Sequence, residues 1–167
     1  MKLPMTTPGR GVPLLLAILV AGSGVASAAA DAEPIRRCSK SQTREFPTSG
    51  FNTDVRLQLC IHYDYANKGY WASATGEATD TGGVRKFDRF DLKIAVQRNN
   101  KNVLTRTYGH AREINEVDSG VPINDWARYF RGSRKGTFTA DAVVTYDLDA
   151  DGKGPRKWQL HGTPPIP

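Results

Sequence analysis

The sequence has few of the features by which enzymes and membrane proteins are commonly recognised. Its 167 residues include only two cysteines and three histidines. It contains no Gly-x-Ser-x-Gly nucleophile motif, no glycine-rich phosphate loop after a strand, and no Asn-x-Ser/Thr acceptor site. An active site of a familiar class is therefore not expected from motifs, and function has to be sought on the surface that the fold presents.

Long apolar runs are also lacking, with one exception near the N-terminus. The apolar run Leu14–Val20 follows a basic segment and precedes a series of small residues. This order is typical of a secretory signal peptide over residues 1–30, cleaved after Ala28 or after Ala30. We favour it over a membrane anchor because the strongly apolar part is much shorter than the ~20 residues of a spanning helix.

Strong charge of either sign is absent too. The formal net charge of +6 falls by two, to +4, if Lys2 and Arg10 leave with the signal peptide. Dedicated nucleic-acid-binding domains are usually more basic, so the balance argues against that class. The chain that remains after residue 30 suits one domain with a workable core.

The two cysteines, Cys38 and Cys60, are expected to form a disulfide, because exported chains with an even cysteine count usually pair them. Closing a loop of this length contributes about 3 kcal/mol in the chain-entropy model. The bond would tie residues 31–52, a leader segment poor in apolar residues, to the strand that carries Cys60. A free nucleophilic thiol is the less favoured alternative, because Cys60 lies near no basic run or helix start.

Alternation of apolar and polar residues dominates the rest of the chain. In the stretch DVRLQLCIHYDY, from Asp54 to Tyr65, every second residue is apolar or aromatic, as in a half-buried strand. Cys60 would then point away from the core, so the leader segment must cross or flank the outer side of this strand. Further strands rich in Val, Ile, Thr, Tyr and Phe are expected at residues 70–79, 86–97, 102–108, 136–149 and 156–160.

Short strands separated by Gly- and Asn-containing turns predict an all-β fold, an antiparallel β-sandwich or small barrel over residues 53–167. In the segment INDWARYF, residues 123–130, Asn124 or Asp125 can cap one short helical turn, and a bent edge strand fits nearly as well. The final HGTPPIP is not expected to continue a ladder, because proline has no amide donor.

His62 and Asp64 are the first candidates for chemistry, since residues two apart on a strand share a face. A small extracellular hydrolase built on this pair, with His110 as a third starting point, is the enzyme alternative. A metal site needs three or more ligands, and no third residue shows recognisable spacing. We therefore favour a solvated strand face. His110 and His161 are isolated in polar contexts and are expected at the surface or in turns.

The stretch DLDADGKG contains a second candidate, because Asp147, Asp149 and Asp151 precede Gly152 as in the first half of a calcium-binding loop. Trp158 occupies the position where such a loop has its closing Glu. We favour a hairpin tip, with weak calcium binding and a calcium-stabilised module as the alternative.

The third candidate is a basic stretch in which aromatic residues are interleaved with Arg128, Arg131, Arg134 and Lys135. Such a mixture can bind polyanions by charge and by stacking, although a charged turn is more often simply solvated. For an exported protein the anionic partners would be teichoic-type polymers, extracellular DNA or acidic proteins. The three tryptophans, Trp71, Trp126 and Trp158, are expected in the core or at its rim.

The cysteine pair and the ending YDLDADGKGPRKWQLHGTP together resemble small secreted proteins of filamentous soil bacteria that have a β-rich domain. The resemblance implies secretion and β-architecture and supplies no catalytic residues. We expect a secreted, single-domain, non-enzymatic protein, without a cofactor, that works by surface recognition of envelope polymers or other proteins.

Overall fold

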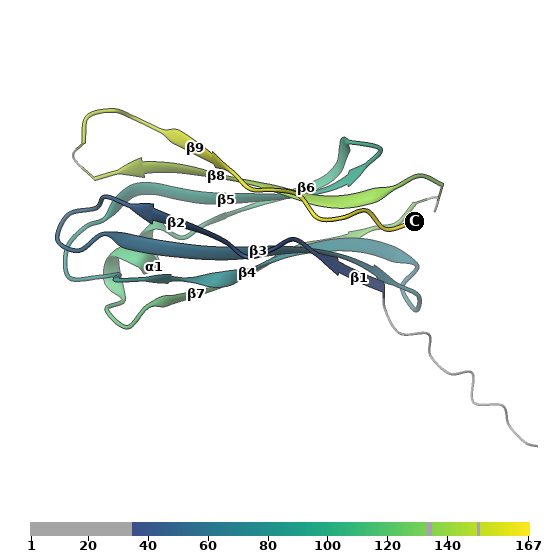
Figure 1. The fold of residues 1–167 in the computed structure, drawn as a ribbon, viewed down its shortest axis with the longest axis horizontal. Coiled ribbons are helices and arrows are strands. Elements are labelled where there is room, and N and C mark those ends of the chain that lie inside the picture. The colour runs from purple at the N-terminus through teal and green to yellow at the C-terminus, as the bar shows by residue number, and fades with distance from the viewer. Residues whose placement is uncertain (1–34, 133–134, 150) are drawn as a thin grey trace, which may run out of the picture. The chain divides into compact units, whose positions relative to one another are not determined.

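The computed structural model describes residues 35–132, 135–149 and 151–167, and they form an antiparallel β-sandwich with one short helix (Figure 1). The all-β fold expected from the alternation is therefore confirmed. The signal peptide expected over residues 1–30 lies outside the described residues, as does Arg134. No helix in the described part of the chain is long and apolar enough to cross a membrane.

Sheet A contains the strand that carries Cys60 and runs in the order β1-β3-β4-β7, with β2 also paired to β3. Its strands are β1 (Ile35–Cys38), β2 (Gln42–Phe46), β3 (Thr53–Asp64), β4 (Gly69–Thr79) and β7 (Val121–Phe130). All pairings are antiparallel. This sheet forms one layer of the sandwich.

The described part of the expected leader segment, residues 35–52, flanks β3 as strands β1 and β2 of sheet A and does not cross the outer face of the sheet. Cys38 pairs with Cys60 and Gln42 pairs with Leu57, so β1 and β2 follow the same edge of β3 with one extra residue between them. Such a bulge bends an edge strand without ending it. Phe46, at the end of β2, is 1% exposed and belongs to the core.

Sheet B forms the other layer and runs in the order β6-β5-β8-β9. Its strands are β5 (Phe87–Arg98), β6 (Lys101–Gly109), β8 (Phe138–Leu148) and β9 (Arg156–Gln159). The expectation that residues 161–167 form no ladder is wrong in part. Thr163 donates its N–H to Ala140, and Ile166 exchanges two backbone hydrogen bonds with Phe138, so the two prolines fall between the bonding residues.

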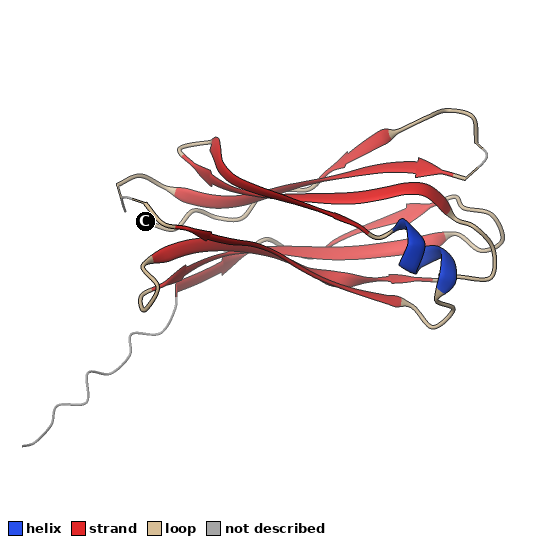
Figure 2. Ribbon diagram, turned by 180° about the vertical axis from the view of Figure 1, so that it is seen from behind, coloured by secondary structure: helices blue, strands red, loops and turns tan. Residues whose placement is uncertain are grey.

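The one helix is α1, Ala111–Glu116, and Figure 2 shows it at one end of the sandwich. A helical turn at residues 123–130 was one of two predictions for that segment and is wrong. The segment belongs to β7, an edge strand whose register against β4 shifts between Tyr70 and Ala72. The bent edge strand is therefore the correct alternative.

The core lies between the inward faces of the two sheets, and aromatic contacts join its layers. Tyr70 of sheet A stacks on Phe138 of sheet B with ring centroids 3.5 Å apart. Phe46 meets Phe87 and Phe90 edge to face. Full burial of each such side chain is worth about 1.5–3 kcal/mol, so these contacts hold the two layers together.

Candidate functional site

A disulfide braces the outer face of sheet A. Cys38 and Cys60 lie directly opposite each other on β1 and β3, with Cα atoms 4.0 Å apart, and are bonded as the sequence predicted. Arg36 donates from Nε to Cys38 Sγ at 3.1 Å and from a terminal nitrogen to Cys60 Sγ at 3.2 Å. These contacts hold an exposed guanidinium in place over the sulfur atoms.

A stacked pair of rings lies beside the disulfide. His62 of β3 is opposite Trp71 of β4, and the rings are 3.6 Å apart and nearly parallel, at 4°. His62 Nε2 also shares a hydrogen bond of 3.1 Å with Ser73 Oγ. Burial, and then the positive charge of Arg36, lower the pKa of His62 from 6.5 to about 4. The imidazole is therefore uncharged at neutral pH.

A second tryptophan extends the same face onto β7. Trp126 is opposite Ser73, and its ring lies under Arg128, whose Cζ is 4.8 Å from the ring centroid. A cation–π contact of this kind contributes about 0.5–1 kcal/mol at an exposed site. The contact fixes the position of the second arginine just as the disulfide fixes that of Arg36.

We call the set Arg36, His62, Trp71, Trp126 and Arg128 the arginine–tryptophan patch. Both arginines are exposed, and neither forms an ion pair with any carboxylate of the described residues. They lie on β1 and β7, three inter-strand steps apart, which corresponds to about 14 Å at ~4.8 Å a step. The patch thus presents two separated positive charges, with the Trp71 indole between their strands and the Trp126 indole beneath Arg128.

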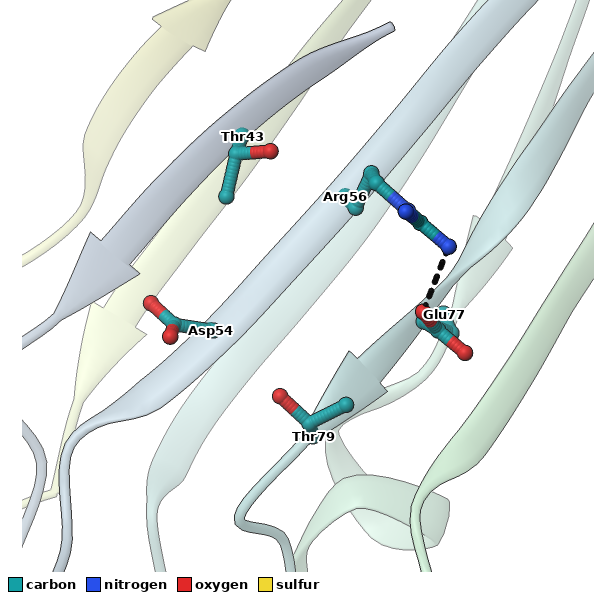
Figure 3. Close-up of a pocket in the computed structure, with 5 residues that line it drawn as sticks. All are labelled: Thr43, Asp54, Arg56, Glu77 and Thr79. Atoms are coloured by element: carbon teal, nitrogen blue, oxygen red, sulfur yellow. Dashed lines mark hydrogen bonds and ion pairs between the residues drawn. The ribbon is translucent and has the colours of Figure 1, made fainter.

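The other half of this face is polar and holds shallow hollows. Figure 3 shows one of about 230 Å³, lined by Thr43, Asp54, Arg56, Glu77 and Thr79. Across it, Arg56 and Glu77 form an ion pair of 2.8 Å, with both side chains roughly half exposed. This arginine is neutralised by its partner, which distinguishes it from the two arginines of the patch.

The proposed pair His62 and Asp64 does not form a joint site. Asp64 accepts the backbone N–H groups of Ala66 and Asn67 and the side-chain amide of Asn67, at 2.8, 3.1 and 2.6 Å. The Asn67 hydrogen bonds, side chain first, lower the pKa of Asp64. Asp64 therefore caps the β3–β4 turn, while His62 is occupied by Trp71 and Ser73.

Two of the three aspartates of the calcium-loop hypothesis, Asp149 and Asp151, have other partners. Asp149 Oδ1 is 3.3 Å from Arg85 Nε, and Asp151 accepts the N–H of Lys153 and pairs with Arg156. Asp147 is opposite Arg89 in the sheet. Among the described residues no group of three or more His, Cys, Asp or Glu side chains gathers as metal ligands would. Weak calcium binding stays a prediction.

The basic stretch of the sequence is divided by the fold. Arg128 belongs to the patch, and Arg131 is exposed just beyond the end of β7. The carbonyl of Lys135 accepts a hydrogen bond of 2.8 Å from Arg98 Nε. The sequence pattern thus identified one member of the patch, and it missed Arg36, which joins the patch only through the pairing of β1 with β3.

His110 was expected at the surface or in a turn, and the surface prediction is wrong. Its side chain is buried, with Nε2 2.7 Å from Asp125 Oδ2 and Nδ1 3.4 Å from Glu113 Oε2. Burial lowers the pKa of His110, but the hydrogen bond and charge of Asp125 and then of Glu113 outweigh it, so the pKa is raised. No local sequence pattern predicts the contact of His110 with Asp125, because Asp125 lies on a different element, β7.

The outer face of sheet A therefore offers a cationic, aromatic surface and no convergent catalytic set among the described residues. Comparison with protein-family models, curated proteins and solved structures finds no match for the chain.

Proposed function

We propose that the protein is exported and acts as a non-catalytic binding protein that recognises an anionic envelope polymer through the arginine–tryptophan patch. The observation that carries this proposal is the pair of exposed arginines, Arg36 on β1 and Arg128 on β7, on one sheet face, with Trp71 on the strand between them and Trp126 beneath Arg128. Neither arginine has a carboxylate partner among the described residues. Their charge is thus available to a ligand.

The chemistry of the patch suits a polymer with repeated negative charges. Guanidinium groups bind carboxylate, sulfate and phosphate oxygens through directed hydrogen bonds, and two separated sites favour an extended ligand. Indole rings add apolar contact area at little conformational cost. Since Arg36 and Arg128 are already held by the disulfide and by Trp126, binding loses less side-chain entropy than it would with free arginines.

Two further features support binding over hydrolysis and export over retention. The pKa of His62 is about 4, and its ring is stacked on Trp71 and hydrogen-bonded to Ser73. His62 is therefore a poor general base near neutral pH. A disulfide between Cys38 and Cys60 is typical of proteins that work in an oxidising compartment.

The test is binding of the purified protein to dextran sulfate, with uncharged dextran as the control polymer, measured by calorimetry. We expect binding to dextran sulfate alone, and about tenfold weaker binding for the double variant Arg36→Gln/Arg128→Gln, which corresponds to about 1.4 kcal/mol. Arg56→Gln is the matched control, because Arg56 lies on the same face but is paired with Glu77. Equal weakening by the control variant, or no binding by the wild type, would contradict the proposal.

The basic stretch beyond β7 gives a second comparison. Replacing Arg131, Arg134 and Lys135 with Ser removes the loop charges and leaves the patch intact. If the patch provides the specific contacts, this variant elutes somewhat earlier from a heparin column but keeps its affinity for dextran sulfate within a few-fold. A larger loss than that of the patch variant would move the site to the loop.

A further inference from the structure

Three loops at the α1 end of the sandwich expose large apolar side chains. Phe51 is 81% exposed, Val84 47% and Val117 38%. They come from the β2–β3, β4–β5 and α1–β7 loops, which meet at the end where Figure 2 shows the helix. A Cβ added at Gly50 would lie 3.6 Å from Val84 Cγ2, and the Thr81 hydroxyl donates to the Val117 carbonyl, so the loops are neighbours.

Phe51 is held in its exposed position by a buried lysine. Lys86 is 3% exposed, and its Nζ donates to the carbonyls of Ser49 and Phe51 at 2.9 and 3.0 Å. The Thr48 hydroxyl donates to the same Phe51 carbonyl at 2.9 Å. Burying an ammonium against carbonyl groups, without a carboxylate among the described residues, is costly. The hydrogen bonds to the carbonyls of Ser49 and Phe51 hold the backbone of this loop in place. An aromatic side chain on such a loop is suited to contact a partner.

Unpaired acidic residues outnumber unpaired basic residues at this end, where Arg112 and Lys153 are the exposed cations without an ion pair among the described residues. Four exposed carboxylates of this end form no ion pair with any described residue, namely Asp54, Asp80, Glu116 and Asp118. A partner that covers Phe51 must therefore present positive charge around an apolar or aromatic contact. We call this surface the acidic end.

The opposite end of the strands presents positive charge around an aromatic side chain. Its exposed basic residues are Lys68, Lys101, Arg131 and Lys135, and Tyr129 is 39% exposed among them. The described residues of the turns here, 65–68, 99–100, 131–132 and 135–137, include no acidic residue. The carboxylate of the nearby Asp64 accepts hydrogen bonds from Ala66 and Asn67 of the β3–β4 turn. We call this surface the basic end.

We propose that copies of this chain associate head to tail, with the acidic end of one copy against the basic end of the next. The occupant is a second copy because the two ends complement each other in charge and each exposes an aromatic side chain. Phe51 of one copy would contact Tyr129 and Arg131 of the next. Because the two surfaces differ, the contact does not close on itself as a two-fold dimer does, and it can repeat along a row. The contact area is small, so association is expected to be weak and sensitive to salt.

Sedimentation velocity of the purified protein tests the proposal across micromolar to millimolar concentrations. At low salt the wild-type weight-average mass should rise with concentration, and at high salt it should return towards that of a monomer. Phe51→Ser and, separately, Asp80→Asn/Asp118→Asn should remain monomeric, as should Arg131→Ser/Lys135→Ser. All of these side chains are exposed, so the fold is retained. Arg106→Ser, an exposed cation on β6 away from both ends, is the control and should behave as the wild type.

Mixing two defective variants distinguishes this geometry from non-specific attraction. Phe51→Ser keeps a working basic end, and Arg131→Ser/Lys135→Ser keeps a working acidic end. An equimolar mixture should therefore form dimers and nothing larger. A wild-type protein that is monomeric at every concentration and low salt overturns the proposal. So does a Phe51→Ser variant that associates like the wild type, or a mixture that forms no dimers.

Discussion

His110 and His62 are both buried, but their surroundings move their pKa values in opposite directions. The pKa of His110 is raised by Asp125 and Glu113 in spite of burial. A raised pKa in the fold means that the stabilisation is fully present below about pH 6.5 and is lost as the pH rises through the folded-state pKa. His110→Gln should therefore reduce the free energy of unfolding by about 1.5–3 kcal/mol at acidic pH, the range for hydrogen bonds to charged groups. Urea unfolding should show a smaller loss at alkaline pH, and a loss that grows with pH would contradict the assignment.

The pKa of His62, about 4, has the reverse consequence for stability. The folded state keeps the ring neutral, so this residue lowers stability progressively as the pH falls below about 6.5, until the folded ring also protonates near pH 4. Arg36→Gln removes the second cause of the shift and leaves burial, the first. We expect the variant's His62 to titrate at a pKa between about 4 and 6.5, measured by NMR of the imidazole proton. A pKa near 6.5 for His62 in the wild type would show that the imidazole is solvated and would contradict this prediction.

At the scale of strands and turns, the sequence predicts a strand best where one face of that strand is buried and the other is exposed. Alternation from Val55 to Tyr63 placed Cys60 on the outer face, and the even cysteine count of an expected exported chain predicted its bond to Cys38. The same reasoning failed for β1 and β2, because their sequences, IRRC and QTREF, have polar residues on both faces and so show no alternation of apolar and polar residues. Arg36 therefore reaches the patch through a pairing that only the fold shows.

Segment 123–130 shows how a local pattern can mislead. Capping residues followed by Trp126 and Phe130, four apart, resemble the start of an amphipathic helix. In the fold Asp125 points inward because it pairs with His110, and Trp126 faces outward beneath Arg128. The structure of this segment depends on a contact between distant segments, that of Asp125 with His110, which a local sequence pattern does not show.

Reduction of the disulfide tests the role of β1 as a strand. The bond spans 22 residues of sequence, for which the chain-entropy model gives about 3 kcal/mol. Cys38→Ser/Cys60→Ser should lose about that free energy of unfolding in guanidinium titration and should show faster amide exchange in β1. The reduced wild type is the matched comparison and should behave the same. Unchanged exchange in β1 would mean that its backbone pairing is sufficient without the bond.

The side chain of Asn115 connects helix α1 to the beginning of β5. Its Oδ1 accepts the N–H groups of Lys86 and Phe87 at 2.8 and 3.0 Å, and its amide donates to the Phe87 carbonyl at 2.8 Å. Asn115→Ala leaves these groups without partners, which should cost about 1–3 kcal/mol. Glu116→Ala, an exposed neighbour in the same helix, should change the free energy of unfolding by less than about 0.5 kcal/mol. Similar losses for both variants would contradict the assignment of this stability to the Asn115 hydrogen bonds, since alanine has the higher helix propensity in both cases.

At the scale of the whole molecule, side chains on distant segments join the two sheets at their edges. Tyr108 of β6 donates to the Trp126 carbonyl of β7. Across the sandwich, Arg44 of β2 donates to Tyr146 Oη of β8 at 2.6 Å. Strand number and alternation predict a β-sandwich or small barrel, but not these pairs, because each pair depends on how one sheet is placed over the other.

The C-terminal segment also joins the two sheets, at the basic end. Ile166, 2% exposed, is bonded to Phe138 of sheet B, and the carbonyl of Pro167 accepts a hydrogen bond of 2.8 Å from Tyr70 of sheet A. Ile166→Ala should lower the free energy of unfolding by about 2–4 kcal/mol, since it removes a buried aliphatic side chain beside the Tyr70–Phe138 stack. Pro165→Ala is the control, because Pro165 is exposed and provides no amide donor. If Ile166→Ala unfolds at the same denaturant concentration as the control, the segment merely lies on the sandwich. If the loss occurs in one cooperative transition, closure by this segment is part of the folding unit itself.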